Sequence, residues 1–287
     1  MTQSRDSATT AVGTTAAWTI VALVTQIALT TFVNFVVFPQ HWLDPIERFS
    51  CGLINTTLLA NLVMLTVLGV LLLGIAKLKP ESWGWRNESI RGAIFWGLVA
   101  LIVTNALEGW ATWSAGDRVT IAHVWSSAPG YAIGDFCGQI FGNALLEELL
   151  YRGLLVTQLA MVLAGSGRPA RRVHWLGALL IGQVVFALIH VPNRVAAGLY
   201  DTPTDFVLDM VVTWLLGVLL GLCWWASGSL LVAVAIHSVM NDPLYLLEPG
   251  NGPGGQVVIL LVIPMALSRL IARRTQRVAV PTEEPMQ

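Results

Sequence analysis

The sequence predicts an all-α, polytopic integral membrane protein with about eight transmembrane helices around a polar cavity. Its 287 residues are 55% hydrophobic and only 11% charged, whereas soluble globular domains contain about 25% charged residues. Long apolar runs alternate with short polar segments, and basic residues gather in every second segment, as they do in the cytoplasmic loops of membrane proteins. We see no internal repeat, and we therefore expect one membrane domain over residues 1–287.

Eight segments satisfy the length requirement for a membrane crossing. A spanning helix needs about 20 mainly apolar residues, because its backbone polar groups must be satisfied within the segment. The fourth segment is longer than one crossing needs, which predicts a tilted helix, a break near Gly142 or an interfacial start. The predicted spans are residues 16–38, 51–76, 92–110, 134–164, 173–191, 205–223, 229–247 and 255–271.

The distribution of Lys and Arg predicts the orientation of these spans. If the eight spans alternate in direction, twelve of the sixteen basic residues fall on one side and three on the other. Because cytoplasmic loops are enriched in basic residues, both termini are expected in the cytoplasm. The twelve are Arg5, Lys77, Lys79, Arg86, Arg91, Arg168, Arg171, Arg172, Arg269, Arg273, Arg274 and Arg277, and the three are Arg48, Arg118 and Arg194.

Charge and cysteine content exclude several other kinds of partner and cofactor. The net charge of -1 gives no electrostatic reason to expect nucleic acid. Three scattered cysteines, Cys51, Cys137 and Cys223, form neither a disulfide framework nor a zinc knuckle. Membrane lipids are the expected surroundings, and no cofactor is indicated.

Ionisable and amide side chains inside the fourth span are the first functional signal. Each ionisable group at membrane depth costs at least about 2.5–3.5 kcal/mol and is a candidate functional residue. Helical spacing places one polar stripe on this span and a second pair, Glu148 and Arg152, about 100° around the helix. The stripe consists of Gln139, Asn143, Glu147 and Tyr151.

Three later spans also have polar groups one helical turn apart. Taken singly, a histidine is more often a packing residue, Glu148–Arg152 can be a structural ion pair, and Asp209 can be a capping carboxylate. The combination is more informative than any one residue. Packing alone does not explain why three spans keep two carboxylates, two histidines and an asparagine when each ionisable group costs free energy at membrane depth. The later groups are Gln183, Phe186 and His190 in the fifth span, Asp209 and Thr213 in the sixth, and His237 and Asn241 in the seventh.

These residue types predict hydrolysis by an activated water. We expect Arg152 to keep Glu148 ionised and Glu147 to exchange protons as a general base. Histidine and asparagine can bind the oxyanion of a tetrahedral intermediate. No covalent nucleophile is indicated, because the sequence has neither a GxSxG elbow nor a recognisable Cys/His signature.

Three motifs in this order resemble the CAAX protease and bacteriocin-processing family (CPBP or ABI), which includes the type II CAAX prenyl endopeptidases. EExxxR occurs at residues 147–152, FxxxH at 186–190 and HxxxN at 237–241. The resemblance covers residues 139–242, the predicted catalytic core of spans four to seven. One departure is Arg194, which stands where prenyl endopeptidases tend to have an asparagine four residues after the second-motif histidine.

The resemblance implies a bacterial, metal-independent glutamate endopeptidase that acts on peptide or lipidated, CAAX-type peptide substrates. In this family Glu147 would activate the water, Glu148 and Arg152 would tune it, and His190 would assist. His237 and Asn241 would stabilise the oxyanion. The predicted catalytic residues are thus Glu147, Glu148, Arg152, His190, His237 and Asn241, and the predicted substrate-pocket or supporting residues are Asn143, Tyr151, Phe186 and Asp209.

Three other functions stay open at this point. Two Glu and two His can bind Zn²⁺ in a metal-dependent protease, although no HExxH motif is present. A non-catalytic scaffold or bacteriocin-immunity protein would use the same cavity to bind a partner. A transporter is disfavoured because no inverted pair of broken spans is seen. With a cytoplasmic amino terminus the cavity would open outward, whereas prenyl processing by eukaryotic relatives faces the cytosol.

Overall fold

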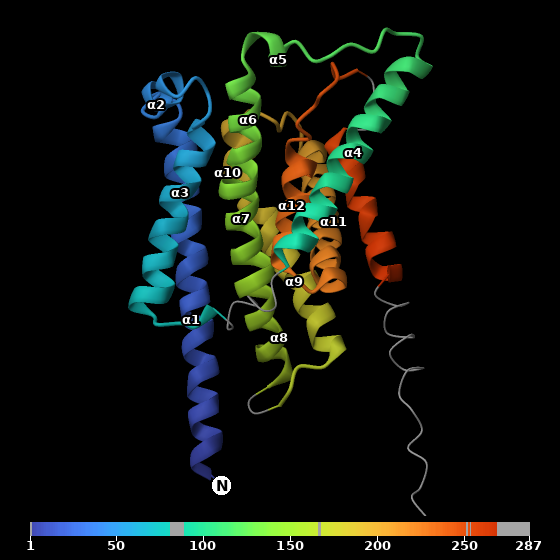
Figure 1. Ribbon diagram of the computed structural model, residues 1–287. Helices are drawn as coiled ribbons and strands as arrows, with labels where there is room; N and C mark the ends of the chain where they lie inside the picture. The colour runs from blue at the N-terminus through green and yellow to red at the C-terminus, as the bar shows by residue number, and fades with distance from the viewer. Residues whose placement is uncertain (1, 81–88, 166–167, 251, 253, 269–287) are drawn as a thin grey trace, which may run out of the picture.

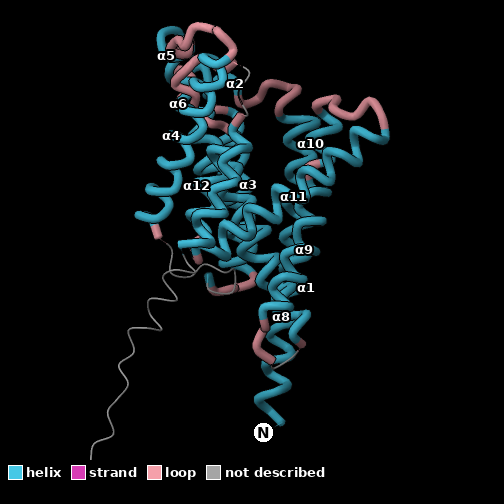
Figure 2. The backbone as a smooth tube through the Cα atoms, turned by 90° about the vertical axis from the view of Figure 1, so that its right-hand side faces the viewer, coloured by secondary structure: helices cyan, strands magenta, loops and turns pink. Residues whose placement is uncertain are grey.

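The protein is an elongated bundle of helices (Figures 1 and 2). The computed structural model describes residues 2–80, 89–165, 168–250, 252 and 254–268, with the backbone alone for residues 2–14. Within these residues there is no strand, only an isolated bridge between Ile121 and Leu247. The predicted all-helical fold is confirmed for this part of the chain.

Two antiparallel helices form one side of the bundle, at the left of Figure 1. The second of them begins at a side-chain cap, since Asn55 Oδ1 accepts a 2.7 Å hydrogen bond from the Leu58 amide. Both helices end in π-helical turns. The elements are α1 (Thr2–Phe32), η1 (Val33–Val37), the short connecting α2 (Asp44–Phe49), α3 (Thr56–Gly69) and η2 (Val70–Ile75).

The fourth predicted span is one long helical segment that changes its hydrogen-bond pattern. The sequence predicts a possible break near Gly142, and the structure has a π-helical stretch there instead. A π-helix has i→i+5 bonds, so each residue turns through a smaller angle than in an α-helix. The pieces are α6 (Pro129–Gly138), η4 (Gln139–Asn143), α7 (Ala144–Glu147), η5 (Glu148–Val156) and α8 (Thr157–Ala164).

The remaining helices enclose α12, which lies at the centre of the bundle in Figure 1. Nine of its twelve residues are buried, because it packs on α4, α11, η6 and the long fourth segment. The elements are α4 (Ile90–Ser114), α5 (Val124–Ser127), α9 (Arg172–Ile189), α10 (Val191–Ala196), α11 (Pro203–Ser227), α12 (Leu230–Asn241), η6 (Gly255–Leu261) and a helix over residues 262–268.

The loop after α12 is fastened to α4 by buried polar groups. Glu108 is only 2% exposed, and its Oε1 accepts hydrogen bonds from the amides of Gly250 at 2.5 Å and Gly252 at 3.2 Å. Asn105 Oδ1 accepts from the Leu246 amide at 2.7 Å. Backbone amides thus replace the water that a buried carboxylate loses, and the carboxyl-terminal end of α12 is held in place.

Five helical stretches within the described residues are long and apolar enough to cross a membrane, so the chain is an integral membrane protein. Each of the eight predicted spans overlaps a helix within the described residues, but a count of eight crossings does not follow. The seventh helix ends at Asn241 rather than 247, and residues 269–271 of the eighth lie outside the described part. The five are Thr15–Val37, Thr56–Ile75, Ile90–Ser114, Arg172–Ala196 and Pro203–Ser227.

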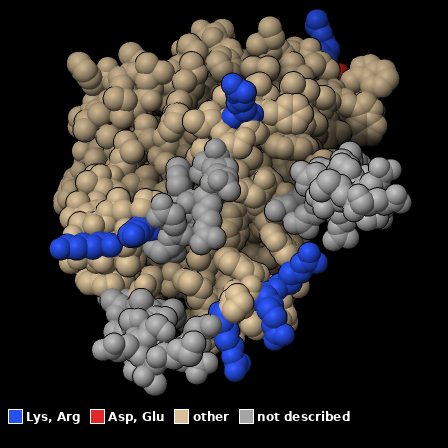
Figure 3. All heavy atoms as spheres, turned by 60° about the horizontal axis from the view of Figure 1, so that its bottom comes forward, with Lys and Arg blue, Asp and Glu red and all other residues tan. Residues whose placement is uncertain are grey.

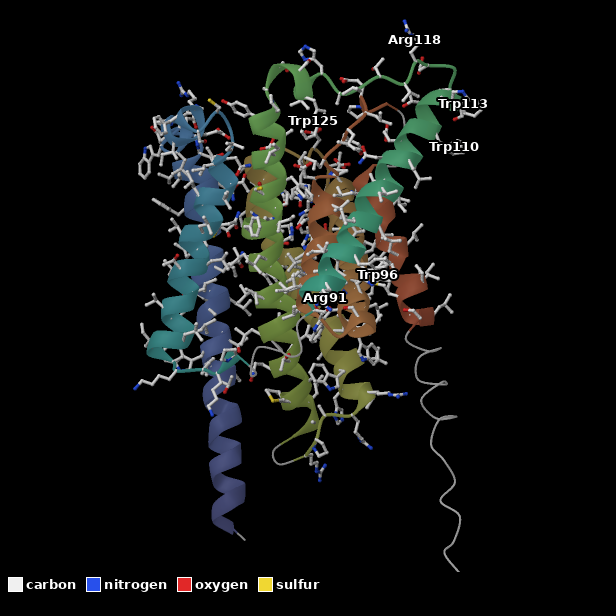
Figure 4. All side chains as sticks on the ribbon, viewed as in Figure 1. Arg91, Trp96, Trp110, Trp113, Arg118 and Trp125 are labelled. Atoms are coloured by element: carbon white, nitrogen blue, oxygen red, sulfur yellow. The ribbon has the colours of Figure 1, made fainter. Side chains whose placement is uncertain are left out.

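Basic side chains gather at one end of the bundle. Figure 3 shows this face, the bottom of Figure 1, with many Lys and Arg and hardly any acidic side chain in view. Figure 4 places Arg91 at the lower end of α4 and Arg118 beyond its upper end, beside the exposed Trp110 and Trp113. Exposed tryptophans suit a membrane interface. The predicted basic residues Arg86, Arg269, Arg273, Arg274 and Arg277, and the side chain of Arg5, lie outside the described part.

This arrangement predicts the sidedness of α4. A reporter inserted at Arg118 should be found outside the cell, and the same reporter at the carboxyl terminus should be found in the cytoplasm, because the end rich in Lys and Arg is expected to face the cytoplasm. Paired alkaline phosphatase and green fluorescent protein fusions measure this. If both positions report the same side, the predicted alternation of spans is wrong.

Candidate active site

A polar cavity of about 350 Å³ lies between α1, α3, the fourth helical segment and the α9–α10 junction. It lies in the half of the bundle away from the amino terminus, because its lining includes the η1 end of α1 and the start of α10 (Figure 1). Its polar lining residues are Gln26, Thr30, Asn34, Thr57, Asn61, Gln139, Asn143, Glu147, His190 and Asn193.

Glu147 extends into this cavity between two imidazole rings. Its side chain is 10% exposed, and its Oε1 lies 3.9 Å from Nε2 of His190. Its Oε2 lies 3.6 Å from Nε2 of His237. Both separations exceed direct hydrogen-bond length, and they have the size that one bridging water fills.

The end of α9 fixes the orientation of His190. The His190 amide bonds to the Ala187 carbonyl, so the Phe186 carbonyl, one of the orphan acceptors of a helix end, is free to accept from Nδ1 of His190 at 2.7 Å. The proton therefore sits on Nδ1 in the neutral ring. Nε2 presents a lone pair toward Glu147, and the i,i+4 spacing of FxxxH has a direct structural reason.

His237 connects the two adjacent glutamates. Its Nδ1 lies 2.8 Å from Oε1 of Glu148 and donates to it, while its Nε2 faces Glu147. Glu148 is 0% exposed and is paired with Nη1 of Arg152 at 3.1 Å. One imidazole thus has a carboxylate on each nitrogen, and the inner carboxylate has its own cation.

Arg152 is held on three sides in the dry interior. It is 0% exposed, its Nη2 donates to the Gly217 carbonyl at 3.2 Å, and its Cζ lies 4.1 Å from the centre of the Phe186 ring, a cation–π contact. Gly217 lets α11 pack closely against α9, because a Cβ there would lie 2.6 Å from Oε1 of Gln183 and 2.9 Å from Phe186.

The predicted supporting residues of the fourth and fifth spans differ in where they lie relative to the cavity. Asn143 lines the cavity. Phe186 is buried and packs edge-on against His190 with ring centres 4.7 Å apart. Tyr151 is fully buried behind the cavity lining, and its hydroxyl donates a 2.6 Å hydrogen bond to Oε1 of Gln26, a lining residue.

Asn241 and Asp209 are among the predicted residues that lie outside the cavity lining. Asn241 is exposed, and its Nδ2 donates to Gln139 Oε1 at 3.1 Å, so it reaches the cavity only through Gln139. Asp209 accepts a 2.7 Å hydrogen bond from the Tyr200 hydroxyl and faces Nε of Arg194 at 3.6 Å. Arg194 is the residue that departs from the prenyl endopeptidase pattern.

Sequence reasoning missed the part of the cavity wall that α1 and α3 supply. A signal was present, because these side chains recur every four residues in otherwise apolar spans, which places them on one helix face. They are Gln26, Thr30 and Asn34 from the first span, and Thr57 and Asn61 from the second. No motif contains them, and only the fold brings them to Glu147.

Metal ions are bound in proteins by sets of His, Cys, Asp and Glu side chains. Among the described residues, no group of three or more His, Cys, Asp or Glu is placed to hold one. Asn143 and Gln139, which share the cavity with Glu147, are amides that can hold a polar substrate by hydrogen bonds.

Comparison with known proteins gives one match. Residues 129–241 match the model of the family described as type II CAAX prenyl endopeptidase Rce1-like. This range begins at the first residue of α6 and ends at the last residue of α12, so it contains all three motifs. No curated protein and no solved structure matches the chain.

Proposed function

Because the chain belongs, through residues 129–241, to the Rce1-like family of type II CAAX prenyl endopeptidases, we propose that it is a membrane-embedded peptidase in which Glu147 activates the attacking water. The observation that supports this most is the spacing of Glu147 from the Nε2 atoms of His190 and His237, 3.9 Å and 3.6 Å. One water oxygen fits between these groups.

In the first chemical step Glu147 takes a proton from this water as the water oxygen attacks the peptide carbonyl carbon. The electron pair of the C=O bond moves to the oxygen, which becomes an oxyanion. His190 holds the water through the lone pair on Nε2, since its Nδ1 already donates to Phe186. A positioned general base contributes about 10²–10⁴ in rate.

His237 and Asn241 are proposed to stabilise the oxyanion. To donate to the oxyanion His237 must enter the step with a proton on Nε2 as well as on Nδ1, and Glu148, which accepts from Nδ1, offsets the charge of this imidazolium as the acid of a Ser-His-Asp triad does. Asn241 bonds Gln139 in this structure, so the peptide must replace that bond to be held by the amide. Glu147 then returns its proton to the leaving amine as the C–N bond breaks.

The substrate is proposed to be a peptide with a lipidated, CAAX-type carboxyl terminus. Apolar side chains among the polar lining of the cavity, including Val33, Phe38 and Met64, suit a chain that enters from lipid. Arg194, which stands where prenyl endopeptidases tend to have an asparagine, places a cation beside Asn193, a cavity residue. This side of the cavity therefore differs from the prenyl endopeptidase pattern.

The test is cleavage by the purified protein in vesicles. Farnesylated CAAX peptides and the same peptides without the lipid are incubated with the protein, and products are identified by mass spectrometry. We expect cleavage of the lipidated peptides and unchanged rates in excess 1,10-phenanthroline. Loss of activity in the chelator, with recovery on added Zn²⁺, would establish the zinc protease instead. If the wild-type protein cleaves the peptides no faster than Glu147→Gln does, this result contradicts any protease function and favours a binding protein.

A further inference from the structure

The catalytic histidine His190 lies at a helix junction that is weakly held by its own backbone. α9 ends at Ile189, and His190 is its C-cap, with φ -75° and ψ -18°. Pro192 follows in the first turn of α10, and proline has no amide hydrogen to donate. The Phe186 carbonyl sets the rotation of the His190 ring, and the backbone position of His190 depends in addition on how α10 is held.

α10 has little burial to fix it. None of its six residues is buried, so apolar packing contributes less here than in the long helices. It contacts α1, η1 and α9, and Asn193 from its first turn lines the cavity. A second constraint is needed to keep this short helix at one position beside Glu147.

Three side chains connect α10 to α11, and we call them the tether: Arg194, Tyr200 and Asp209. Nε of Arg194 lies 3.6 Å from Oδ2 of Asp209, and the Tyr200 hydroxyl donates to the same oxygen at 2.7 Å. Burial, and then the hydrogen bond to Asp209, raises the pKa of Tyr200 to about 12. The phenol therefore keeps its proton and remains a donor at every pH used for assay.

Backbone hydrogen bonds also connect the tether to His190. The Leu199 amide donates to the Arg194 carbonyl at 3.0 Å, and the Arg194 amide donates to the His190 carbonyl at 2.9 Å. A displacement of Arg194 is thus passed to His190 through one backbone hydrogen bond. Asp209 itself lies in the second turn of α11, a long helix that packs along α9.

We propose that Asp209 is a positioning residue that, through Arg194 and with Tyr200, holds α10 against α11 and so keeps Nε2 of His190 aimed at Glu147. This role rests on the proposed function of His190. None of the three tether residues lines the cavity, so the tether acts on the geometry of the site and not on the substrate. A misplacement of about 1 Å in a catalytic group can cost about a hundredfold in rate.

The stability contribution of the tether is small by comparison. Its two charged side chains are 35% and 26% exposed, and ion pairs with this exposure contribute little to folding because water screens them. Asp209→Ala is therefore expected to fold normally. Its kcat should fall about tenfold to a hundredfold, with KM within about twofold of the wild-type value.

A double-mutant cycle with His190 separates positioning from general damage. Asp209→Ala should lower kcat in the wild-type background and have almost no effect when His190→Ala is already present, because the group that it positions is gone. Asp201→Ala, an exposed neighbour in the same loop, is the matched control and should change nothing. Equal effects of Asp209→Ala in both backgrounds would overturn the proposal.

A second measurement does not depend on activity. In a variant with Cys51 and Cys137 replaced by serine, Ile189→Cys, at a buried position beside His190 that lines the cavity, is labelled with a water-soluble maleimide. Adding Asp209→Ala should raise the labelling rate several-fold, and adding Asp201→Ala should not. If no peptide is cleaved, the proposed peptidase function is contradicted. The labelling rate still decides in that case whether the tether holds α10. An unchanged labelling rate rejects the tether.

Discussion

Glu147→Gln is expected to lower kcat for peptide hydrolysis about a thousandfold and to leave the fold intact. Glutamine has the size of glutamate and can hydrogen-bond a water, but it cannot accept the proton that the attacking oxygen must lose. The side chain is partly exposed to the cavity, 10%, and has no direct ion pair shorter than 3.6 Å. Its loss of charge therefore removes chemistry with little change in packing.

The measurement is single-turnover cleavage of the best peptide from the panel, followed by mass spectrometry. Asp117→Asn, which removes a carboxylate from an exposed loop position, is the control and should retain wild-type kcat. Thermal unfolding in detergent should be the same for both variants. If Glu147→Gln retains more than about a tenth of the wild-type kcat, Glu147 is not the general base.

Glu148 is the alternative base, and the geometry argues against it. Its Oε1 already pairs with Arg152 and accepts from His237, and its side chain is fully buried. A water that attacks a peptide must be reached by substrate, and only Glu147 of the two lines the cavity. Glu148→Gln should therefore act indirectly, by weakening the hold on His237, and should reduce kcat less than Glu147→Gln does.

Much of the fold and the core of the site could be predicted from local sequence patterns. Hydropathy indicates a spanning helix because length and apolarity are properties of one segment. The pairs Phe186–His190 and Glu148–Arg152 are separated by four residues, and a helix turn brings such pairs together whatever surrounds them. The side chains of Glu147, His190 and His237 then converge because polar groups in lipid gather where they can pair.

Other features depend on tertiary packing and leave no local pattern. Nothing in the spacing of residues 148–156 distinguishes the π-helical turns of η5 from an α-helix, and the hydrogen bond from Tyr151 to Gln26 joins two helices that are distant in the sequence. The placement of Asn241 on Gln139 depends on how α12 meets η4. The tether joins residues from two helices and the loop between them, so Asp209 is recognisable as a polar residue but not as the partner of Arg194.

The largest effect on stability is expected from Arg152→Ala. Removing the guanidinium leaves the fully buried Glu148 carboxylate without its cation, and breaking a buried ion pair in this way costs about 3–5 kcal/mol of unfolding free energy. The variant also loses the hydrogen bond to Gly217 and the contact with Phe186. Unfolding by increasing fractions of SDS in mixed micelles measures this loss.

A paired variant distinguishes charge from packing in this interior. Arg152→Met keeps most of the apolar volume against Phe186 but leaves Glu148 charged and unpaired, so it should lose almost as much stability as Arg152→Ala. Adding Glu148→Gln to Arg152→Met should restore most of that loss, because a neutral pair avoids the isolated charge. Arg168→Met, at an exposed loop position, should stay within about 0.5 kcal/mol of wild type. If the double variant is no more stable than Arg152→Met, pairing of the Glu148 charge is not what Arg152 contributes to stability. Arg152 then stabilises the protein through its packing against Phe186.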